Sequence, residues 1–365
     1  MIIKDKPLRK IVFWGVGNTF RLAIKFMDHS SNIVVALIDN NKEMYGKQIC
    51  DLTVSPPDIL GNVEFDVIII TVGDYVSVFK QLISMGILIN KILIFNEEYF
   101  KLNKENFFKK EDHVDVLFSG ISYANCLKLR NLSYANISAG SQDIFFDSVL
   151  TRVFMKRRKI KFFCHVLSQY SLEYNLLYST NYSLVTRYHF LGKTFAEELK
   201  TVCPKYAKLF NKRIAKSKII KKYNPNIAFH DIFNYSELSV EDELLFADTA
   251  KLHSNKNYPE TVYENKKIVE DLVVFCLENN VTPILLTLPQ HKIYRENFSE
   301  RIYLEFIKFI QYLQNRYNIQ YINSYCDDYE KQLFFDGDHL NFKGYQIYCN
   351  TLENRLIDIR RTIGV

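Results

Sequence analysis

Apolar runs that end in small or polar residues and lead into helical patterns recur along the first part of the chain. The earliest run, KIVFWGVGNTFRLAIKFM, contains Gly15 and Gly17 and passes into a segment whose apolar residues have helical spacing. The runs NIVVALIDNN, FDVIIITVGDY and NKILIFNEEY follow, and the helical pattern YVSVFKQLISMGI separates the last two. Strands that alternate with helices predict a parallel sheet with right-handed crossovers. We therefore expect an α/β domain over residues 1–105.

The order of strand, small-residue turn and helix begins again at HVDVLFSGISYANCLKLRNL, where the turn is SGIS. The later runs SYANIS, KRRKIKFFCHV, VTPILLT and IQYINSY predict further strands. A charged segment at about 98–113 lacks a strand pattern and marks the predicted boundary. The second domain is expected over residues 112–365, with a helical insertion at about 190–260. The predicted fold class is thus α/β, with two domains that each contain a doubly wound, mostly parallel sheet.

Composition limits the classes of protein to which the chain can belong. Hydrophobic residues make up 48% and charged residues 24% of the chain, as in soluble globular domains. The net charge of +6 comes from 47 basic and 41 acidic residues spread along the chain, which argues against nucleic acid as a partner. No segment approaches the roughly 20 apolar residues that span a bilayer, and the first apolar run is too short for a signal peptide. Seven scattered cysteines lack metal-ligand spacing and predict reduced thiols, so we expect a cytoplasmic protein and no metal site.

The glycine turn near the N-terminus is typical of strand–turn–helix units that bind nucleotides. Gly15 and Gly17 follow the first strand, and Asp39 ends the second strand about 20 residues later, where an acid can bind a ribose. Phe20 stands where a third glycine would allow close packing, so tight dinucleotide binding is not expected. Two interpretations stay open. One is a site for a sugar nucleotide or similar anion at these residues, and the other is a scaffold that binds nothing.

The stretch FFDGDHLNFKGYQIY, near the end of the sequence, places two carboxylates and a histidine before an amphipathic segment. One interpretation is a helix cap made by Asp336 or Asp338. The other is that Asp336 orients His339 as a general base, which then needs a nucleophile. Ser122 is the candidate, because it follows the first strand of the second domain and begins a helix whose free amides could hold an oxyanion. Its alternative role is to cap that helix.

Further polar residues follow the other strands of the second domain. Gly140 comes after the second strand, Gln169 follows the third with Asn175 close behind, and His291 follows the fourth. Because the carboxyl ends of parallel strands share one edge of an open sheet, we expect these residues near Ser122. Gly140, Gln169 or Asn175 would contact the oxyanion or the substrate. His291 could touch the substrate as well, but a solvated loop histidine is the preferred interpretation.

Over residues 113–360 this series resembles the SGNH (GDSL-like) hydrolase superfamily. The resemblance implies that Ser122, in GIS, is the nucleophile and that Gly140, in SAGSQ, donates to the oxyanion. It further implies that the DGDH motif supplies His339 as the base and Asp336 as the residue that orients it. No metal or other cofactor is required by this chemistry.

The chain departs from that family in two motifs. GIS stands where the family has GDS, and LSQYS stands where it has G-x-N-D. Gln169 would then replace the family's asparagine as the third oxyanion donor, with Asn175 as its rival. The segments GVGNTFRLAI, VVALIDNNKEMYGKQI and DVIIITVGD give residues 8–97 a separate resemblance to the Rossmann-like nucleotide-binding domain found ahead of bacterial sugar-modifying enzymes.

Together the resemblances imply serine-dependent transfer of an acyl group, above all acetyl, to a carbohydrate, or its hydrolysis from one, in bacterial surface glycan biosynthesis. The partner would be a carbohydrate or glycan precursor, with a sugar nucleotide or an acyl donor such as acetyl-CoA as substrate. A homo-oligomer is compatible with the sequence. The alternative is a non-catalytic carbohydrate-binding or assembly protein with a degenerate SGNH fold; the altered serine and asparagine motifs favour it, and the intact D-x-x-H motif disfavours it. A sugar-nucleotide oxidoreductase would need a catalytic base near Gly15, and the sequence offers none.

Overall fold

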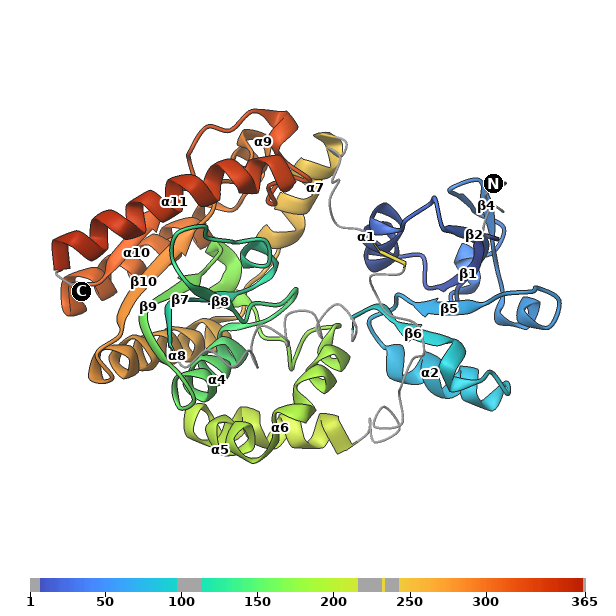
Figure 1. Ribbon diagram of the computed structural model, residues 1–365, viewed down its shortest axis with the longest axis horizontal. Coiled ribbons are helices and arrows are strands. Elements are labelled where there is room, and N and C mark those ends of the chain that lie inside the picture. The colour runs from blue at the N-terminus through green and yellow to red at the C-terminus, as the bar shows by residue number, and fades with distance from the viewer. Residues whose placement is uncertain (1–6, 97–112, 216–231, 234–242, 364–365) are drawn as a thin grey trace, which may run out of the picture. The chain divides into compact units, whose positions relative to one another are not determined.

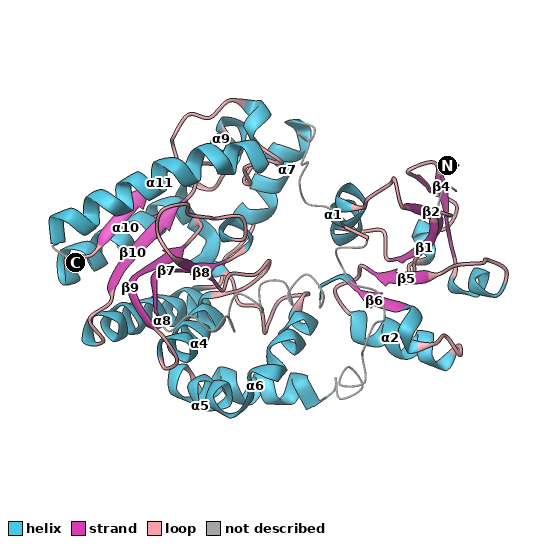
Figure 2. Ribbon diagram, in the orientation of Figure 1, coloured by secondary structure: helices cyan, strands magenta, loops and turns pink. Residues whose placement is uncertain are grey.

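The computed structural model describes residues 7–96, 113–215, 232–233 and 243–363. The chain forms two compact units (Figure 1). The N-terminal unit comprises Met1–Lys101, Thr180–Phe190 and Leu209–Glu237, and the C-terminal unit comprises Leu102–Ser179, Leu191–Lys208 and Leu238–Val365. Each unit contains its own mainly parallel sheet together with helices (Figure 2), which confirms the expected α/β fold class.

The N-terminal unit is built on a six-stranded sheet with the order β3-β4-β2-β1-β5-β6. Its strands are β1 (Arg9–Trp14), β2 (Asn32–Ile38), β3 (Gln48–Ile49), β4 (Leu52–Ser55), β5 (Val67–Ile70) and β6 (Ile92–Ile94). Neighbouring strands are parallel except for β3 and β4. The helices are α1 (Asn18–Phe26) and α2 (Tyr75–Ser84), with the short 3₁₀ helices η1 (Lys42–Met44), η2 (Pro57–Gly61) and η3 (Ile89–Lys91). The strand order reverses at β1, the kind of position at which open parallel sheets bind ligands.

Phe20 explains why the glycine pattern of the first turn is incomplete. Its side chain is buried in α1, and its ring meets the ring of Phe13 edge-on, with the ring centroids 5.1 Å apart. Phe13 itself lies on β1. The aromatic ring therefore fills the space between helix and strand that a third glycine would have left for close approach.

The N-terminal unit is completed by a segment far along the chain. Phe233 forms an isolated antiparallel bridge with Met27, and its ring packs edge-on against Phe95, with the centroids 5.1 Å apart. Phe233 falls within the helical insertion that the sequence predicts for the second domain at about 190–260. The structure instead divides this insertion between the two units, because these apolar contacts belong to the N-terminal one. The predicted boundary between residues 105 and 112 lies outside the described residues.

The C-terminal unit contains a five-stranded sheet with the order β11-β10-β9-β7-β8, in which all neighbours are parallel. Its strands are β7 (His113–Gly120), β8 (Tyr134–Asn136), β9 (Lys159–Val166), β10 (Thr282–Thr287) and β11 (Gln320–Asn323). Its main helices are α4 (Ile144–Met155), α5 (Gly192–Val202), α7 (Glu243–Ser254), α8 (Pro259–Glu278), α9 (Lys292–Asn297), α10 (Glu300–Tyr317) and α11 (Phe342–Ile363). Short 3₁₀ helices are η4 (Ser122–Ala124), η5 (Gln169–Glu173) and η9 (Lys331–Leu333), while η6 (Tyr182–Leu191) and α6 (Pro204–Ala215) belong partly to each unit. Within the described ranges, no helix combines the length and apolar character needed to cross a membrane.

The two faces of the C-terminal sheet are covered by different helices. Phe118 of β7 packs in one apolar cluster with Tyr348 and Leu352 of α11. Ser119, the next residue, faces the opposite side of the strand and donates to Asp147 of α4. α4 and α8 pack side by side on that side (Figure 1). The sheet is therefore buried on both faces, which leaves the carboxyl ends of its strands as the edge where polar side chains can collect.

Candidate active site

The position of Ser122 is set by a close approach between two strands. β7 ends at Gly120, whose φ is +145°, and a Cβ at this position would lie 2.4 Å from the carbonyl oxygen of Val166 on β9. Only glycine fits this conformation and this contact without strain. Ser122 follows as the first residue of η4, and the first N–H groups of a helix have no intrahelical partner. The turn thus presents a hydroxyl beside an amide that is suited to an oxyanion.

The loop that carries His339 is closed by its own hydrogen bonds. Asp336 Oδ1 accepts the backbone N–H groups of Asp338 at 3.0 Å and of His339 at 2.8 Å. Neither aspartate caps α11, which begins at Phe342. Asn341 does so instead, accepting the N–H of Gly344 at 3.1 Å. The cap interpretation of these carboxylates is therefore wrong, because the helix starts several residues later.

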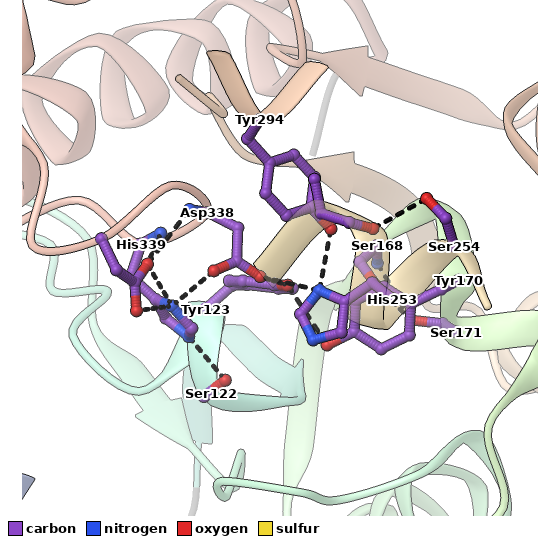
Figure 3. A network of polar contacts seen from close by, with 12 residues as sticks. Ser122, Tyr123, Ser168, Tyr170, Ser171, His253, Ser254, Tyr294, Asp338 and His339 are labelled. Atoms are coloured by element: carbon purple, nitrogen blue, oxygen red, sulfur yellow. Dashed lines mark hydrogen bonds and ion pairs between the residues drawn. The ribbon is translucent and has the colours of Figure 1, made fainter. Parts of the chain in front are cut away.

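Ser122, His339 and Asp336 come together as a chain of hydrogen bonds (Figure 3 shows Ser122 and His339). Ser122 Oγ lies 2.8 Å from His339 Nε2, and His339 Nδ1 lies 2.9 Å and 3.0 Å from the two carboxylate oxygens of Asp336. A proton on Nδ1 leaves the Nε2 lone pair free to accept the serine proton. The imidazole keeps 25% of its side-chain surface exposed, so the pair is reachable from solvent.

Electrostatics around His339 favour its protonated form. Burial lowers the pKa of His339, but Asp336 and then Asp338 oppose this effect more strongly, so that the pKa stands well above its usual range. The pKa of Asp336 is raised, chiefly by burial. The pKa of Asp338 is lowered because His339 and hydrogen-bond donors outweigh its burial. The two carboxylates therefore stabilise the charged imidazolium that forms when His339 takes a proton.

Three contacts of this centre were not predicted from the sequence, although Asp338 was considered as a helix cap. Asp338 Oδ1 lies 3.1 Å from His339 Nδ1, and Asp338 Oδ2 accepts the hydroxyl proton of Tyr123. His253 Nδ1 lies 3.3 Å from Asp338 Oδ2 (Figure 3). Asp338 directly precedes His339, and Tyr123 directly follows Ser122. These adjacent positions could have indicated that both residues lie in the site. His253 comes from α7, and no spacing in the sequence connects it to the DGDH motif.

The predicted oxyanion residues lie in the loops on either side of the serine turn. Gly140 follows β8, and a Cβ there would meet nothing within 4 Å, so its surroundings are open. Gln169 begins η5 after β9; it is 1% exposed, and both polar atoms of its side chain lack a hydrogen-bond partner. Asn175 uses Oδ1 to accept the N–H of Leu177 at 3.0 Å, while its Nδ2 is unpaired. Buried unpaired amides are rare, and a ligand would satisfy them.

A buried polar network holds these loops behind the sheet edge. Asp147 of α4 accepts from Ser119 Oγ at 2.7 Å and from Gln142 Nε2 at 2.6 Å, and it lies 3.1 Å from His165 Nε2. Gln142 also donates to the carbonyl of Ile137 at 3.1 Å. These bonds tie the loop after β8, which contains Gly140, to β7 and β9.

His291 lies next to the catalytic loop, but its side chain has a structural role. Its Nδ1 accepts the N–H of Ile293 at 3.3 Å as the N-cap of α9, and its ring packs against Phe246 and Phe334. Its backbone N–H donates to the carbonyl of Gly337 at 2.9 Å. His291 is half-buried, and both the solvated-loop interpretation and a substrate contact stay predictions.

In the N-terminal unit, Asp39 is occupied by backbone hydrogen bonds and Gly15 by a close approach. Asp39 Oδ2 accepts the N–H of Val16 at 3.1 Å, and its Oδ1 accepts the N–H of Asn41 at 2.8 Å. Gly15 has a φ of +103°, and a Cβ there would lie 2.3 Å from Val72 Cγ1, whereas a Cβ at Gly17 would meet nothing within 4 Å. Packing and turn closure thus account for Gly15 and Asp39, and nucleotide binding stays a prediction.

Metal-ligating groups also converge in the C-terminal site. Asp336, Asp338 and His339 bring one side-chain ligand atom each within 4.8 Å of one another. The clustering of these three residues is thus explained by their mutual hydrogen bonds, and the absence of a metal stays a prediction.

Comparisons with known proteins give a limited match to each unit. Residues 8–93 match a family model described as C2185-like, N-terminal, and no curated protein matches the chain. Among solved structures, a putative acylhydrolase from Bacteroides fragilis is similar with a TM-score of 0.34 and 13% identity, over 72% of this chain and 96% of that one. A GDSL-like lipase from Bacteroides thetaiotaomicron has a TM-score of 0.34 and 12% identity over 72% and 99%.

An acetylxylan esterase from Geobacillus stearothermophilus, solved as a catalytic mutant, has a TM-score of 0.32 and 10% identity, over 67% of this chain and 94% of that one. Because these TM-scores and identities are low, the similarity alone assigns neither a family nor an activity. The hydrogen-bonded serine, histidine and aspartate of this chain must therefore support any functional conclusion.

Proposed function

We propose that the C-terminal unit is a serine-dependent acyl hydrolase or acyltransferase. The observation that carries the proposal is the chain of contacts in which Ser122 Oγ lies 2.8 Å from His339 Nε2 and His339 Nδ1 lies 2.9 Å from Asp336. A serine hydroxyl, a base within hydrogen-bond distance and a carboxylate that fixes the base are the three parts that such catalysis needs. A packing role alone would require none of these contacts at a partly exposed edge.

The reaction proceeds in two steps. His339 Nε2 takes the proton of Ser122 Oγ as this oxygen bonds to the acyl carbon, and the carbonyl electrons move to the oxyanion. The bond to the leaving alkoxide then breaks, and the alkoxide receives the proton from Nε2. In the second step water or an acceptor hydroxyl attacks the acyl-serine, gives its proton to Nε2, and Ser122 leaves with that proton. Water as the attacking group gives hydrolysis, and an acceptor hydroxyl gives transfer.

The oxyanion would be held by the amide of Ser122, by the loop that contains Gly140, and by the side-chain amide of Gln169. Gln169 supports this role better than Asn175, because both of its polar atoms are buried without a partner while Asn175 already caps a turn. Removing one oxyanion donor costs about 10²–10³-fold in kcat in serine hydrolases. Gln169 is therefore the donor whose substitution would be most informative.

We further propose that the acyl group is acetyl and that it is carried by a carbohydrate, in the biosynthesis of bacterial surface glycans. This part is supported by the resemblance of the motifs to SGNH proteins and of residues 8–97 to domains found ahead of sugar-modifying enzymes. The non-catalytic alternative, a carbohydrate-binding or assembly protein, predicts an inert Ser122.

Labelling of the full chain with a fluorophosphonate, followed by peptide mapping, tests the proposal. We expect label on Ser122 and hydrolysis of p-nitrophenyl acetate, both lost in Ser122→Ala. Ser133→Ala is the matched control, because Ser133 is exposed and its hydroxyl donates to the Asp115 carboxylate at 2.9 Å instead of meeting an imidazole. Unlabelled Ser122 in an active-site titration would favour the non-catalytic alternative. Release of acetate from peracetylated glucose tests the carbohydrate assignment separately.

A further inference from the structure

A second carboxylate lies against His339, and the two-step reaction does not require it. Asp338 Oδ1 is 3.1 Å from His339 Nδ1, the same nitrogen that Asp336 holds at 2.9 Å. Asp338 is 1% exposed, so its charge is withdrawn from water. A single N–H cannot satisfy two carboxylates, and two carboxylates this close together repel each other unless further donors compensate.

Those further donors come from separate elements of the C-terminal unit. Tyr123, in η4, donates its hydroxyl proton to Asp338 Oδ2, and the hydroxyl of Tyr170, in η5, lies 3.2 Å from that of Tyr123. His253, at the end of α7, places Nδ1 3.3 Å from the same Asp338 oxygen. Tyr294, in α9, places its hydroxyl 2.8 Å from His253 Nδ1 (Figure 3). Two elements, η4 and α7, thus contact the carboxylate directly, and η5 and α9 support them through Tyr170 and Tyr294.

The tautomer of His253 follows from these contacts. His253 Nδ1 lies 2.8 Å from the Tyr294 hydroxyl and 3.3 Å from the Asp338 carboxylate, and a carboxylate oxygen can only accept, so the tautomer with a proton on Nδ1 suits this contact. Burial lowers the pKa of His253 to about 3, with the charges of Lys256 and His339 acting in the same direction. His253 is therefore a neutral donor and does not cancel the charge of Asp338.

Tyr123 connects this carboxylate to the nucleophile. It follows Ser122 directly, its ring lies 4.6 Å from the imidazole ring of His339 between centroids, and its carbonyl accepts the hydroxyl of Tyr345 at 2.9 Å. One residue therefore supports the serine turn, the face of the imidazole and the second carboxylate. A shift of Asp338 would therefore disturb Tyr123 and, through it, the serine turn and the imidazole.

We propose that Asp338 is a second positioning residue for His339, held in place by Tyr123 and His253, and that it fixes the imidazole with Nε2 toward Ser122. The inference rests on the proposed function, because the direction of Nε2 matters only if His339 acts as the base. The charged and titratable groups that face the imidazole and this carboxylate are Asp336 from the same loop, Tyr123, Tyr170, Tyr294, His253 and Lys256.

Titration of His339 by NMR in histidine-labelled protein tests the electrostatic part without requiring turnover. Asp338→Asn keeps the shape and removes one anion beside the imidazole, so the pKa of His339 should fall relative to the wild type. Glu353→Gln is the matched control. Glu353 is also buried, and its Oε1 accepts the N–H groups of Arg130 at 2.9 Å and Leu132 at 3.0 Å, away from His339. An unchanged pKa of His339 in Asp338→Asn would overturn the proposal.

The pH profile of hydrolysis tests positioning. In Asp338→Asn the acidic limb of kcat/KM should move to lower pH, because His339 loses its proton earlier. On the alkaline plateau kcat should fall about 10-fold with little change in KM, since one charged hydrogen bond is lost and Asp338 does not touch substrate. A loss of stability without either change, as expected for Glu353→Gln, would contradict positioning.

A second pair of variants covers the case in which Asp338→Asn does not fold. His253→Ala removes a donor to Asp338 and should lower kcat, whereas His253→Asn offers an amide N–H near the Nδ1 position and should restore most of the loss. Equal activity in the two variants would overturn the role of His253. If the pKa of His339 shifts as expected but Ser122 takes no fluorophosphonate, the proposed function fails while the contact of Asp338 with His339 stands.

Discussion

The turns after β1 and β7 are built alike and differ in what their polar groups contact. Gly15 and Gly120 both have positive φ, and a Cβ on either would collide with a neighbouring segment, at Val72 just after β5 or at Val166 on β9. Beyond the first turn, Asp39 binds two backbone N–H groups. Beyond the second, the hydroxyl of Ser122 meets the side chain of His339. Glycine thus builds the turn, and chemistry depends on a side chain that the turn leaves available.

The largest expected effect is the loss of turnover in Asp336→Asn. Asp39→Asn, in the first turn, is its counterpart. Asp336 accepts two backbone N–H groups on one oxygen, which asparagine can also do, so Asp336→Asn should move the free energy of unfolding little. Asp39 accepts Val16 and Asn41 on different oxygens, so Asp39→Asn leaves one N–H without its acceptor and should cost about 1 kcal/mol. Asp336→Asn should lower kcat about 10⁴-fold, because an amide favours the wrong tautomer of His339. Asp39→Asn should leave kcat unchanged. Steady-state hydrolysis and urea denaturation measure both, and an Asp336→Asn protein with nearly wild-type turnover would contradict the triad.

A smaller effect is expected for the paired substitutions Gly120→Ala and Gly15→Ala. Both place a Cβ in a strained backbone and against Val72 or Val166, and each should destabilise its unit by about 1–3 kcal/mol. Only Gly120→Ala should also lower turnover, because it displaces the turn that carries Ser122. Gly17→Ala, with open space around the new Cβ, should change neither property. Equal loss of turnover in the Gly15 and Gly120 variants would show that the two turns are not independent.

The smallest effect is expected for Asp39→Ala. It removes the acceptor for Val16 and Asn41 and should cost about 1–2 kcal/mol in urea denaturation, with kcat unchanged. Calorimetry with a uridine diphosphate sugar separates the two interpretations of this turn. Sugar-nucleotide binding by the wild type that Asp39→Ala abolishes, without loss of stability, would favour the ligand interpretation over turn closure.

The sheets and the triad could be predicted because they depend on local patterns. Apolar runs mark the strands, and parallel strands place Ser122 and the loop of His339 at one edge. Asp336 and His339 belong to a single short loop, so their contact needs no distant information. Gly140 and Gln169 follow from the same argument, since β8 and β9 flank β7.

The rest depends on packing that no local pattern encodes. His253 reaches Asp338 because α7 packs beside the loop, with Phe246 against Gly337, and the sequence of α7 shows only an ordinary helix. The capping role was assigned to the wrong residues because Asp and Asn cap equally well, and only the true start of α11 selects Asn341. Phe233 was placed in the wrong unit because an apolar residue in a polar stretch does not identify its partner.

The contacts of Phe233 have a consequence for how the N-terminal unit folds during synthesis. All six strands of the N-terminal sheet have been synthesised by Ile94, but Met27 and Phe95 must wait for Phe233 before their contacts form. At about 5–20 residues per second, that interval lasts roughly 7–30 seconds on the ribosome. During it, β7, β8 and β9 emerge beside an N-terminal sheet whose apolar surface is incomplete. Nascent chains arrested before residue 233 should therefore engage chaperones more strongly than chains arrested after it.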